Sequence, residues 1–346
     1  MAKSIIYSSG SPLCGSPIIY KVTAATLSET AAVSLHSLIV EVSCSLSSVG
    51  KTYVYPTRCS VSSGETVDID VSSALRAVAD AYEYTPEPPS EYPYIAYSLK
   101  AYDEYILNGE LFQNVGEVTS NDHKALLGAY SDLDRIAAGG SKLAQHFSRK
   151  PTSSSPELLV LGESIVTPIS LASPISEASI TKGPTSAITT PSTIGAQIIN
   201  GRHVYVYVDS AIPRYQFRFV NSLGCLESIS VTSLKSSEMQ TTVNQWSRRT
   251  PQSFSNISRT VHVKQGDKER WTLNSGPIDR DWQQWFLHEF LMSPDVWLLV
   301  DNHWLPCHII LEDTTTIYDE ITREPRSVSF TIEFDFYGSP YLSLTV

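Results

Sequence analysis

The alternation of apolar and polar residues predicts that most of the chain forms β-strands. Side chains in a strand point to opposite faces in turn, so an apolar residue at every second position is typical of a strand buried on one face. One alternation of this kind runs over 38–46. The clearest one closes the chain and comprises Val328, Phe330, Ile332, Phe334 and Phe336.

Two Asn-Gly pairs predict tight β-hairpins. Asn and Gly accept the positive φ angles that a type I′ turn requires. Asn108-Gly109 separates the β-prone runs 94–107 and 110–118, and Asn200-Gly201 separates two shorter runs. We therefore expect one hairpin in each half of the chain.

Apolar residues three and four positions apart predict two helices. The first lies near 71–82, and Asp70 is placed to cap its start. The second spans 279–292, with Asp279 or Asp281 as its cap. Its apolar face is aromatic and comprises Trp282, Trp285, Phe286 and Phe290.

Two further elements are predicted from local composition. After Pro294, the runs 296–300 and 304–311 are apolar and β-prone, and the turn residues between them predict a hairpin. Earlier in the chain, the Ala- and Leu-rich sequence of residues 120–147 predicts a short helix that ends at Gly139-Gly140.

Length and composition predict about two domains in a chain of 346 residues. We expect a β-rich domain over 1–149 and another over 194–346. The Ser/Thr/Pro-rich segment 150–193 is expected to be a linker, an extended assembly arm or an inserted β-loop. The predicted fold class is mainly β with a few short helices, in two β-sandwich-like or α+β domains.

The charge and cysteine content exclude several classes of protein. The net charge is −11 and the longest basic cluster, Arg248-Arg249, has two residues, which argues against a nucleic-acid partner. We find no apolar run long enough for a membrane span or a signal peptide, so we expect synthesis in the cytoplasm and no membrane partner. Five scattered cysteines without C-x-x-C spacing are interpreted as buried thiols.

Two short motifs suggest nucleotide or acyl chemistry, and neither fits its template. The run Val49-Gly50-Lys51-Thr52 resembles the end of a phosphate-binding loop, but a strand is predicted where a helix should begin. The run 221–225 lacks the G-x-S-x-G frame of a nucleophile elbow and fits a turn between strands.

Possible metal ligands are explained more simply by ordinary structure. His303, Cys307 and His308 lie near one another in sequence, but adjacent residues of a strand face opposite sides and do not readily share an ion. The acidic pairs 312–313 and 319–320 could offer oxygen ligands to calcium, but they lack EF-hand spacing. We interpret them as a solvated acidic edge.

Glu333 and Asp335 share one face of the closing strand, as two acids of a glycosidase would. The same pattern describes two exposed acids with no catalytic role. We therefore expect no enzyme, and we assign no catalytic, cofactor-binding or metal-binding residue. The tyrosine-rich stretch 82–105 is too polar and too rich in proline to be wholly buried, which makes it a candidate interface.

Three segments of the second half, 214–229 (RYQFRFVNSLGCLESI), 291–319 and 327–339, resemble minor tail and baseplate-type structural proteins of phages and prophages of Bacteroides-like bacteria, of the distal-tail type. The first half is similar in the order of PIIYKV (17–22) and ETVDIDVSSALRAV (65–78). The resemblance covers most of the chain except 150–193, and it includes no catalytic motif.

This resemblance implies a non-enzymatic virion protein of the tail tip, baseplate or a tail-attached ring, without a cofactor. Its expected partners are copies of itself in a ring and other phage tail proteins, contacted through 84–93 and 150–193. The competing hypothesis is a module that binds carbohydrate or the host surface. In that case two or more of Trp282, Trp285, Trp297 and Trp304 should line an open groove, whereas a scaffold should bury them.

Overall fold

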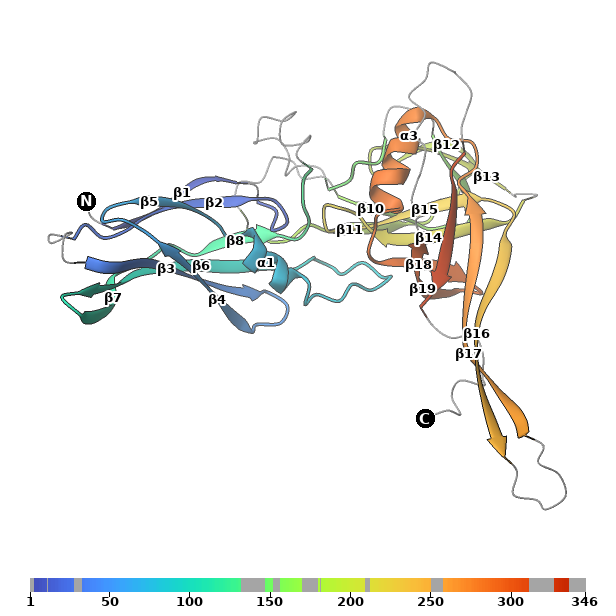
Figure 1. The fold of residues 1–346 in the computed structure, drawn as a ribbon. Coiled ribbons are helices and arrows are strands. Elements are labelled where there is room, and N and C mark those ends of the chain that lie inside the picture. The colour runs from blue at the N-terminus through green and yellow to red at the C-terminus, as the bar shows by residue number, and fades with distance from the viewer. Residues whose placement is uncertain are drawn as a thin grey trace. The chain divides into compact units, whose positions relative to one another are not determined.

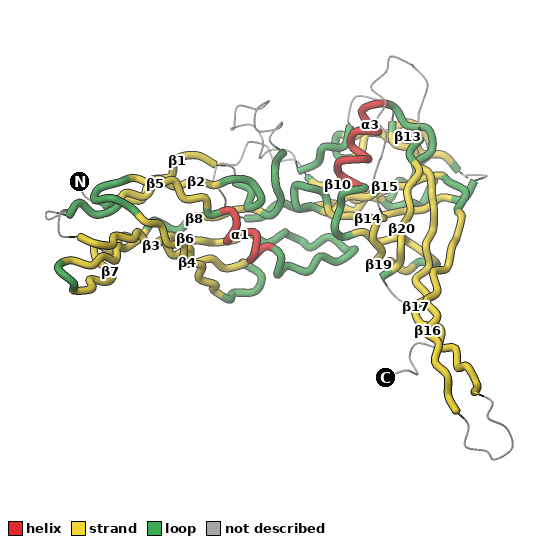
Figure 2. Tube along the Cα trace, viewed as in Figure 1, coloured by secondary structure: helices red, strands yellow, loops and turns green. Residues whose placement is uncertain are grey.

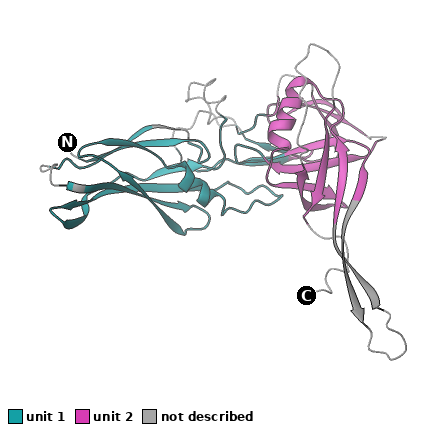
Figure 3. Cartoon of the chain, viewed as in Figure 1, with its two compact units in different colours: residues 1–149, 166–188, 221–227 teal, residues 150–165, 189–220, 228–346 magenta. Residues whose placement is uncertain are grey.

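The computed structural model describes residues 3–10, 12–27, 33–131, 147–151, 156–169, 180, 182–208, 212–249, 258–310 and 327–335, with the backbone alone at 9–10, 34, 239–249 and 258–267. It is mainly β with short helices, as the sequence predicts (Figure 2). Two compact units are formed (Figure 3). Unit 1 comprises Met1–Arg149, Val166–Ile188 and Asn221–Glu227, and unit 2 comprises Lys150–Ile165, Thr189–Val220 and Ser228–Val346.

Unit 1 contains two antiparallel sheets that share one core (Figure 1). One sheet has the order β1-β2-β5, and the other has β4-β3-β6-β7 with β8 beside β6. The alternating residues of β3 lie in this core, and the hydroxyls of Tyr20 and Tyr97, one from each sheet, are 3.1 Å apart. The strands are β1 (Ser4–Gly10), β2 (Ile18–Thr23), β3 (Val33–Leu46), β4 (Thr52–Ser60), β5 (Thr66–Asp70), β6 (Tyr94–Leu107), β7 (Glu110–Thr119) and β8 (His123–Leu126).

The hairpin and the helix predicted for unit 1 are present, but the predicted helix cap is not the N-cap residue. Asn108 and Gly109 have φ angles of 53° and 86° and join β6 to β7. The helix α1 (Ser72–Ala79) lies within the predicted range. Its N-cap is Val71 and not the predicted Asp70. Asp70 lies one residue earlier, and its Oδ1 accepts hydrogen bonds from the N–H groups of Ser72 (2.9 Å) and Ile18 (3.1 Å). One carboxylate therefore fixes both the start of α1 and its place beside β2.

The short helix predicted within 120–147 is wrong where the chain is described. Residues His123–Leu126 form β8, which pairs antiparallel with Tyr94–Tyr97 of β6. Ala125 and Leu126 are fully buried there. The free edge of β6 and the core beneath it outweigh the weak helix propensity of these residues. Residues 132–146, including Gly139-Gly140, lie outside the described part of the chain.

Unit 2 is centred on a seven-stranded antiparallel sheet in the order β15-β14-β18-β19-β20-β17-β16. The helix α3 (Arg280–Trp285) and the π-helical segment η4 (Phe286–Phe290) pack on one face of it, where Phe219 contacts Trp285 and Phe330 contacts Phe286. The strands are β14 (Arg214–Val220), β15 (Leu226–Thr232), β16 (Ser236–Arg249), β17 (Ser258–Asn274), β18 (Val296–Val300), β19 (His303–Ile310) and β20 (Ser329–Phe334).

The predicted helix over 279–292 is present but changes character halfway. Asp279 is the N-cap, and its Oδ1 accepts a hydrogen bond of 3.0 Å from the N–H of Trp282. At the other end the N–H of Leu291 donates to the carbonyl of Phe286, five residues back, which is the π-helical pattern. The hairpin after it forms as expected, with φ angles of 48° and 63° at Asp301 and Asn302.

The segment 150–193 contains strands where it is described, so it is not simply a linker. β9 (Glu157–Val160) pairs parallel with β13 (Arg202–Tyr207), whose other neighbour is β12 (Gly195–Ile199). β10 (Ile165–Pro168) is buried at all four positions and pairs with β11 (Ser186–Thr189). The segment contributes residues to both units.

The last two strands of the large sheet continue beyond their neighbours (Figures 1 and 2). β20 pairs only with the stretch of β17 from Arg270 to Asn274, and β16 is the final strand of the sheet. Eleven register pairs, from Met239↔Glu269 to Arg249↔Ser258, therefore have no third strand beside them among the described residues. The outermost eight begin at Thr242↔Gln265, after a shift in register. We call residues 242–249 and 258–265 the outer ribbon.

Candidate functional site: a pocket beside the aromatic helix

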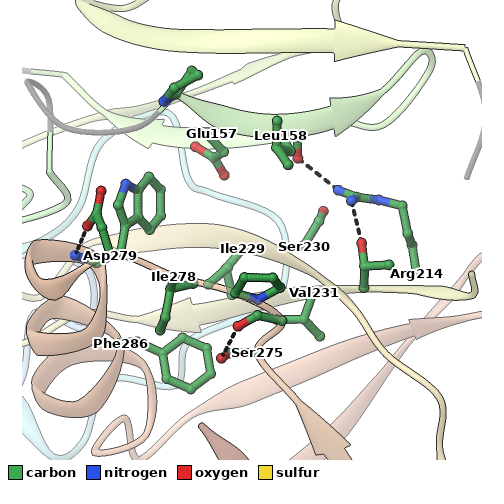
Figure 4. Close-up of a pocket in the computed structure, with 15 residues that line it drawn as sticks. Glu157, Leu158, Arg214, Ile229, Ser230, Val231, Ser275, Ile278, Asp279 and Phe286 are labelled. Atoms are coloured by element: carbon green, nitrogen blue, oxygen red, sulfur yellow. Dashed lines mark hydrogen bonds between the residues drawn. The ribbon is translucent and has the colours of Figure 1, made fainter. Parts of the chain in front are cut away.

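A pocket of about 340 Å³ lies within unit 2, between β9 and the start of α3 (Figure 4). Three stretches form its walls, namely 156–158, 229–232 and 275–286, with Arg214 at one side. Asp279 caps α3 and so fixes where the helix begins. Trp282 and Phe286 are four residues apart, which places them on the same side of the helix, and both line the pocket. The walls are therefore largely apolar, with a few polar groups among them.

Arg214 is fully engaged by the protein. Its Nε and Nη2 donate to the two carboxylate oxygens of Glu163 at 2.9 and 3.0 Å. Its Nη1 donates to the hydroxyls of Tyr207 and Thr232, both at 2.8 Å, and Nη2 also reaches the carbonyl of Leu158. A guanidinium held in this way ties β14 to β9 and has little capacity left to bind a ligand.

Lys150 and Glu157 form a buried ion pair next to the pocket. The Nζ of Lys150 is 2.6 Å from Oε1 of Glu157 and 2.8 Å from the carbonyl of Ser228. The same Nζ lies 5.4 and 5.1 Å from the ring centroids of Trp282 and Trp285. A cation held between two indole rings and a carboxylate is well compensated for its loss of water. The Lys150–Glu157 pair therefore connects α3, which carries the two tryptophans, with β9, which carries Glu157.

The lining residues can hold an apolar group but lack the parts of a catalytic site. They include hydroxyls at Ser230, Thr232 and Ser275, but no histidine or cysteine lies among the residues of this pocket to activate them. Glu157 is engaged by Lys150, and Asp279 caps the helix. The geometry fits a small apolar ligand or a side chain of a partner protein.

Glu333 and Asp335 belong to one network of charges. Asp335 is exposed, as the interpretation of two exposed acids requires, but Glu333 is buried. Lys268 and Arg270 donate to Glu333 at 2.9 and 2.7 Å, and His308 lies 2.7 Å from Asp335. Desolvation raises the pKa of Glu333, but the hydrogen bonds and positive charges of Lys268 and Arg270 outweigh it, so the pKa is below its ordinary 4.5. An acid kept ionised in this way is a poor proton donor.

His303, Cys307 and His308 are not brought together by the structure. His303 is exposed at the hairpin turn, and His308 lies beside Asp335 and Glu333. Cys307 is buried in the core under the helix, where burial raises the pKa of its thiol to about 12. No group of three or more potential metal ligands occurs among the described residues. The acidic pairs 312–313 and 319–320 lie outside the described part.

The two short motifs form turns. Gly50 has a φ of 69° in the turn between the antiparallel strands β3 and β4, and the Nζ of Lys51 lies 4.9 Å from the Tyr53 ring. In the second motif, Oδ1 of Asn221 accepts from the N–H groups of Leu223 (3.1 Å) and Cys225 (2.9 Å). The second motif is the turn that was expected, and the first is followed by the strand β4 from Thr52, as predicted, and not by a helix.

A buried charge cluster in unit 1 was not predicted from the sequence. Asp103 on β6 is wholly buried and lies 2.6 Å from Nζ of Lys3 and 3.0 Å from Nε2 of His36, and it accepts from the N–H of Ala25 at 3.2 Å. Desolvation lowers the pKa of Lys3, although Asp103 acts in the opposite direction. One signal was present, since Asp103 follows Leu99 and Ala101 on the inward face of its strand.

Most of the tryptophans tested as a possible sugar platform are buried. Trp282, Trp285 and Trp297 are at most 8% exposed. Trp304 is partly buried and packs at 4.2 Å under the guanidinium of Arg218. Of the four, Trp282 alone lines the pocket described above. Three of the four tryptophans therefore belong to the interior of unit 2.

No protein-family model, curated protein or solved structure matches the chain. Among the described residues, no helix is both long and apolar enough to span a membrane.

Proposed function

We propose that the protein is a non-enzymatic structural component of a phage tail, in the tail tip, the baseplate or a tail-attached ring, and that it assembles through contacts between subunits. The outer ribbon carries this proposal. A two-stranded ribbon is marginally stable on its own in water. In the part of the chain that the structure describes, no third strand pairs with either edge of this ribbon. A strand of another chain can extend an edge of this kind through backbone hydrogen bonds.

Two other features support an assembly role. The aromatic residues of α3 and η4 are buried against the sheet, which makes a rigid base for the ribbon within unit 2. The sequence resemblance to tail and baseplate-type proteins supplies the setting, since virion proteins of this kind act by occupying a fixed place among other subunits. In this setting the protein is made in the bacterial cytoplasm and ends in the virion tail.

The test is to locate the protein in phage particles. Particles released from the bacterium that carries the gene are purified, their proteins are identified by mass spectrometry, and antibodies against this chain are applied with gold labels for electron microscopy. We expect the protein in the particles and gold at the tail. Particles that contain capsid and tail proteins but lack this chain would overturn the proposal.

A second candidate function is binding of a host-surface glycan, and the pocket beside Trp282 favours it, because an indole next to a cavity is a common way to stack a sugar ring. A glycan array with polysaccharides of the host surface tests this idea. Binding that is lost when Ser230 is replaced by Tyr, to fill the pocket, would support it. A Thr272→Ser variant of unit 2, away from the pocket lining, serves as the control.

A further inference from the structure

The pocket beside α3 has one unpaired acceptor in its wall. All of its lining residues belong to the described part of the chain. Oε1 of Glu157 is paired with Lys150, but Oε2 of the same carboxylate is buried and has no hydrogen-bond partner among the described residues. Figure 4 shows this carboxylate pointing from β9 into the pocket. A buried carboxylate oxygen without a donor costs free energy, so a ligand that supplies a donor at this point is favoured.

Most other polar side chains of the wall already have partners. The hydroxyl of Thr232 accepts from Nη1 of Arg214, and all N–H groups of Arg214 donate to protein acceptors. The hydroxyl of Ser275 donates to a backbone carbonyl at 2.8 Å and accepts from a backbone N–H at 2.9 Å. Asp279 caps the helix. A ligand in this pocket therefore meets few further polar side chains, of which Ser230 is one.

The rest of the wall is apolar and partly aromatic. Trp282 and Phe286 come from the helix, and Ile229 and Ile278 are among the aliphatic side chains of the wall. The ring of Trp282 is held by an edge-to-face contact with Trp285, at 5.4 Å between the centroids. A ring surface that is already fixed binds another ring at a low cost in entropy. The volume of about 340 Å³ is at the lower end of the range for small-molecule sites, which suits a ligand of one or two rings.

We infer that the pocket binds an aromatic ring that carries one hydrogen-bond donor, namely a phenol or an indole. The ring packs against Trp282, Phe286 and the aliphatic wall, and its O–H or N–H donates to Oε2 of Glu157. The inference does not rest on the proposed tail role, because all residues of the pocket belong to unit 2 and the ligand is recognised by them alone.

A sugar ring fits this wall less well than a phenol or an indole. A sugar carries several hydroxyl groups, and each hydroxyl that is buried without a partner costs free energy. Most polar side chains of the wall are already paired, so several hydroxyls of a buried sugar would lack partners. A phenol or an indole has a single donor, which matches the single unpaired oxygen of Glu157. The two classes of ligand can therefore be separated by experiment.

The experiment titrates the full chain with matched small probes. One is p-cresol, which is the side chain of tyrosine as a free molecule. The second is p-methylanisole, in which the same oxygen is methylated and cannot donate, and the third is toluene, which lacks the oxygen. Glucose and galactose represent sugars. Binding is measured by ligand-observed nuclear magnetic resonance and by the change in tryptophan fluorescence. These probes test the need for a donor in the unaltered protein.

Three variants locate the binding. Ser230→Tyr fills the pocket, and Thr272→Ser, outside the pocket lining, is the control. The double variant Lys150→Met with Glu157→Leu removes the acceptor. It replaces both members of the buried pair by apolar residues, because removing one member alone would leave the other charge buried without a partner. Circular dichroism checks that each variant is folded.

We expect p-cresol to bind saturably, and at least about tenfold more tightly than p-methylanisole or toluene, because it alone can donate to Glu157. The double variant should bind p-cresol and p-methylanisole equally. Ser230→Tyr should bind neither, and Thr272→Ser should bind both as the wild type does. A further probe, N-acetyltyrosinamide, separates two sources of the phenol. Binding as tight as that of p-cresol indicates a tyrosine of a partner protein, and much weaker binding indicates a free small molecule.

Several results would overturn the inference. They are a wild type that does not bind p-cresol, equal affinity of the wild type for p-cresol and p-methylanisole, and binding that survives in a folded Ser230→Tyr variant. Tighter binding of glucose or galactose than of p-cresol would also overturn it, in favour of the glycan function. The wild-type titrations decide even if the double variant does not fold. None of these results bears on the tail role, which the gold labelling of phage particles tests separately.

Discussion

Asp103 in unit 1 and Glu333 in unit 2 are two carboxylates with similar partners in different surroundings. Each lies beside a lysine and a histidine, and Glu333 also has Arg270. The side chains around Asp103 are at most 5% exposed, whereas those around Glu333 are 34–42% exposed. The carboxylate of Glu333 is itself only 8% exposed, so the two sites differ mainly in the exposure of the partners. We therefore expect the ion pairs of Asp103 to contribute far more to the free energy of unfolding than those of Glu333.

The largest effect should come from Asp103→Asn. The amide keeps the shape but leaves Lys3 and His36 buried without their negative partner, and breaking a buried pair in this way costs about 3–5 kcal/mol. The measurement is urea unfolding followed by far-ultraviolet circular dichroism. A loss no larger than that of Glu333→Gln would show that burial does not separate the two sites.

Tryptophan fluorescence sharpens this test, because all six tryptophans lie in unit 2, within Ser228–Val346. We expect the fluorescence transition of Asp103→Asn to stay at the wild-type urea concentration if the two units unfold independently. A parallel shift of both signals would show that they unfold together.

Glu333→Gln should have a smaller effect, a loss of about 1 kcal/mol in the free energy of unfolding, because water around the exposed partners screens their interaction with Glu333. The loss should appear in the fluorescence transition and shrink at high salt. The matched control is Glu238→Gln, an exposed acid of the same sheet. A loss that is unchanged in 1 M salt would contradict the surface character of this network.

The pH dependence should follow the pKa of Glu333. Its pKa is lower in the folded protein than the ordinary 4.5, so the folded state holds fewer protons than the unfolded state in this range. The contribution of Glu333 to stability is therefore complete above pH 4.5 and is lost as pH falls through the folded-state pKa. Wild type and Glu333→Gln should converge in stability below that pKa, and a constant difference would refute this assignment.

The smallest effect should come from Asp335→Asn. His308 and Asp335 are 2.7 Å apart, but both side chains are more than 40% exposed. Exposed pairs of this kind contribute about 0 to 1 kcal/mol, and we expect a change within about 0.5 kcal/mol for this one. A larger loss would mean that Asp335 supports the whole network around Glu333.

The charge networks show how far sequence reasoning reaches. That Glu333 and Asp335 share one face of a strand follows from their spacing, but their partners come from β17 and β19, which are distant in sequence. Asp103 and Lys3 are 100 residues apart in the sequence. They meet only because the sheet that contains β6 packs against the sheet that begins with β1. For the pocket, the aromatic face of 279–292 was predictable, whereas the opposite wall from β9 was not.

The sequence alone determined the local features of this protein. The alternation of β3 and β20, the turns at Asn108-Gly109 and Asp301-Asn302 and the cap at Asp279 depend on φ, ψ and side-chain period, which a few neighbouring residues decide. Only the tertiary structure decided that 123–126 is an edge strand, that β9 lies parallel to β13 and that no described strand pairs with the outer ribbon. These three features depend on which strands pair with one another. The pairing of strands is decided by burial and hydrogen bonding across the whole unit, and not by a few neighbouring residues.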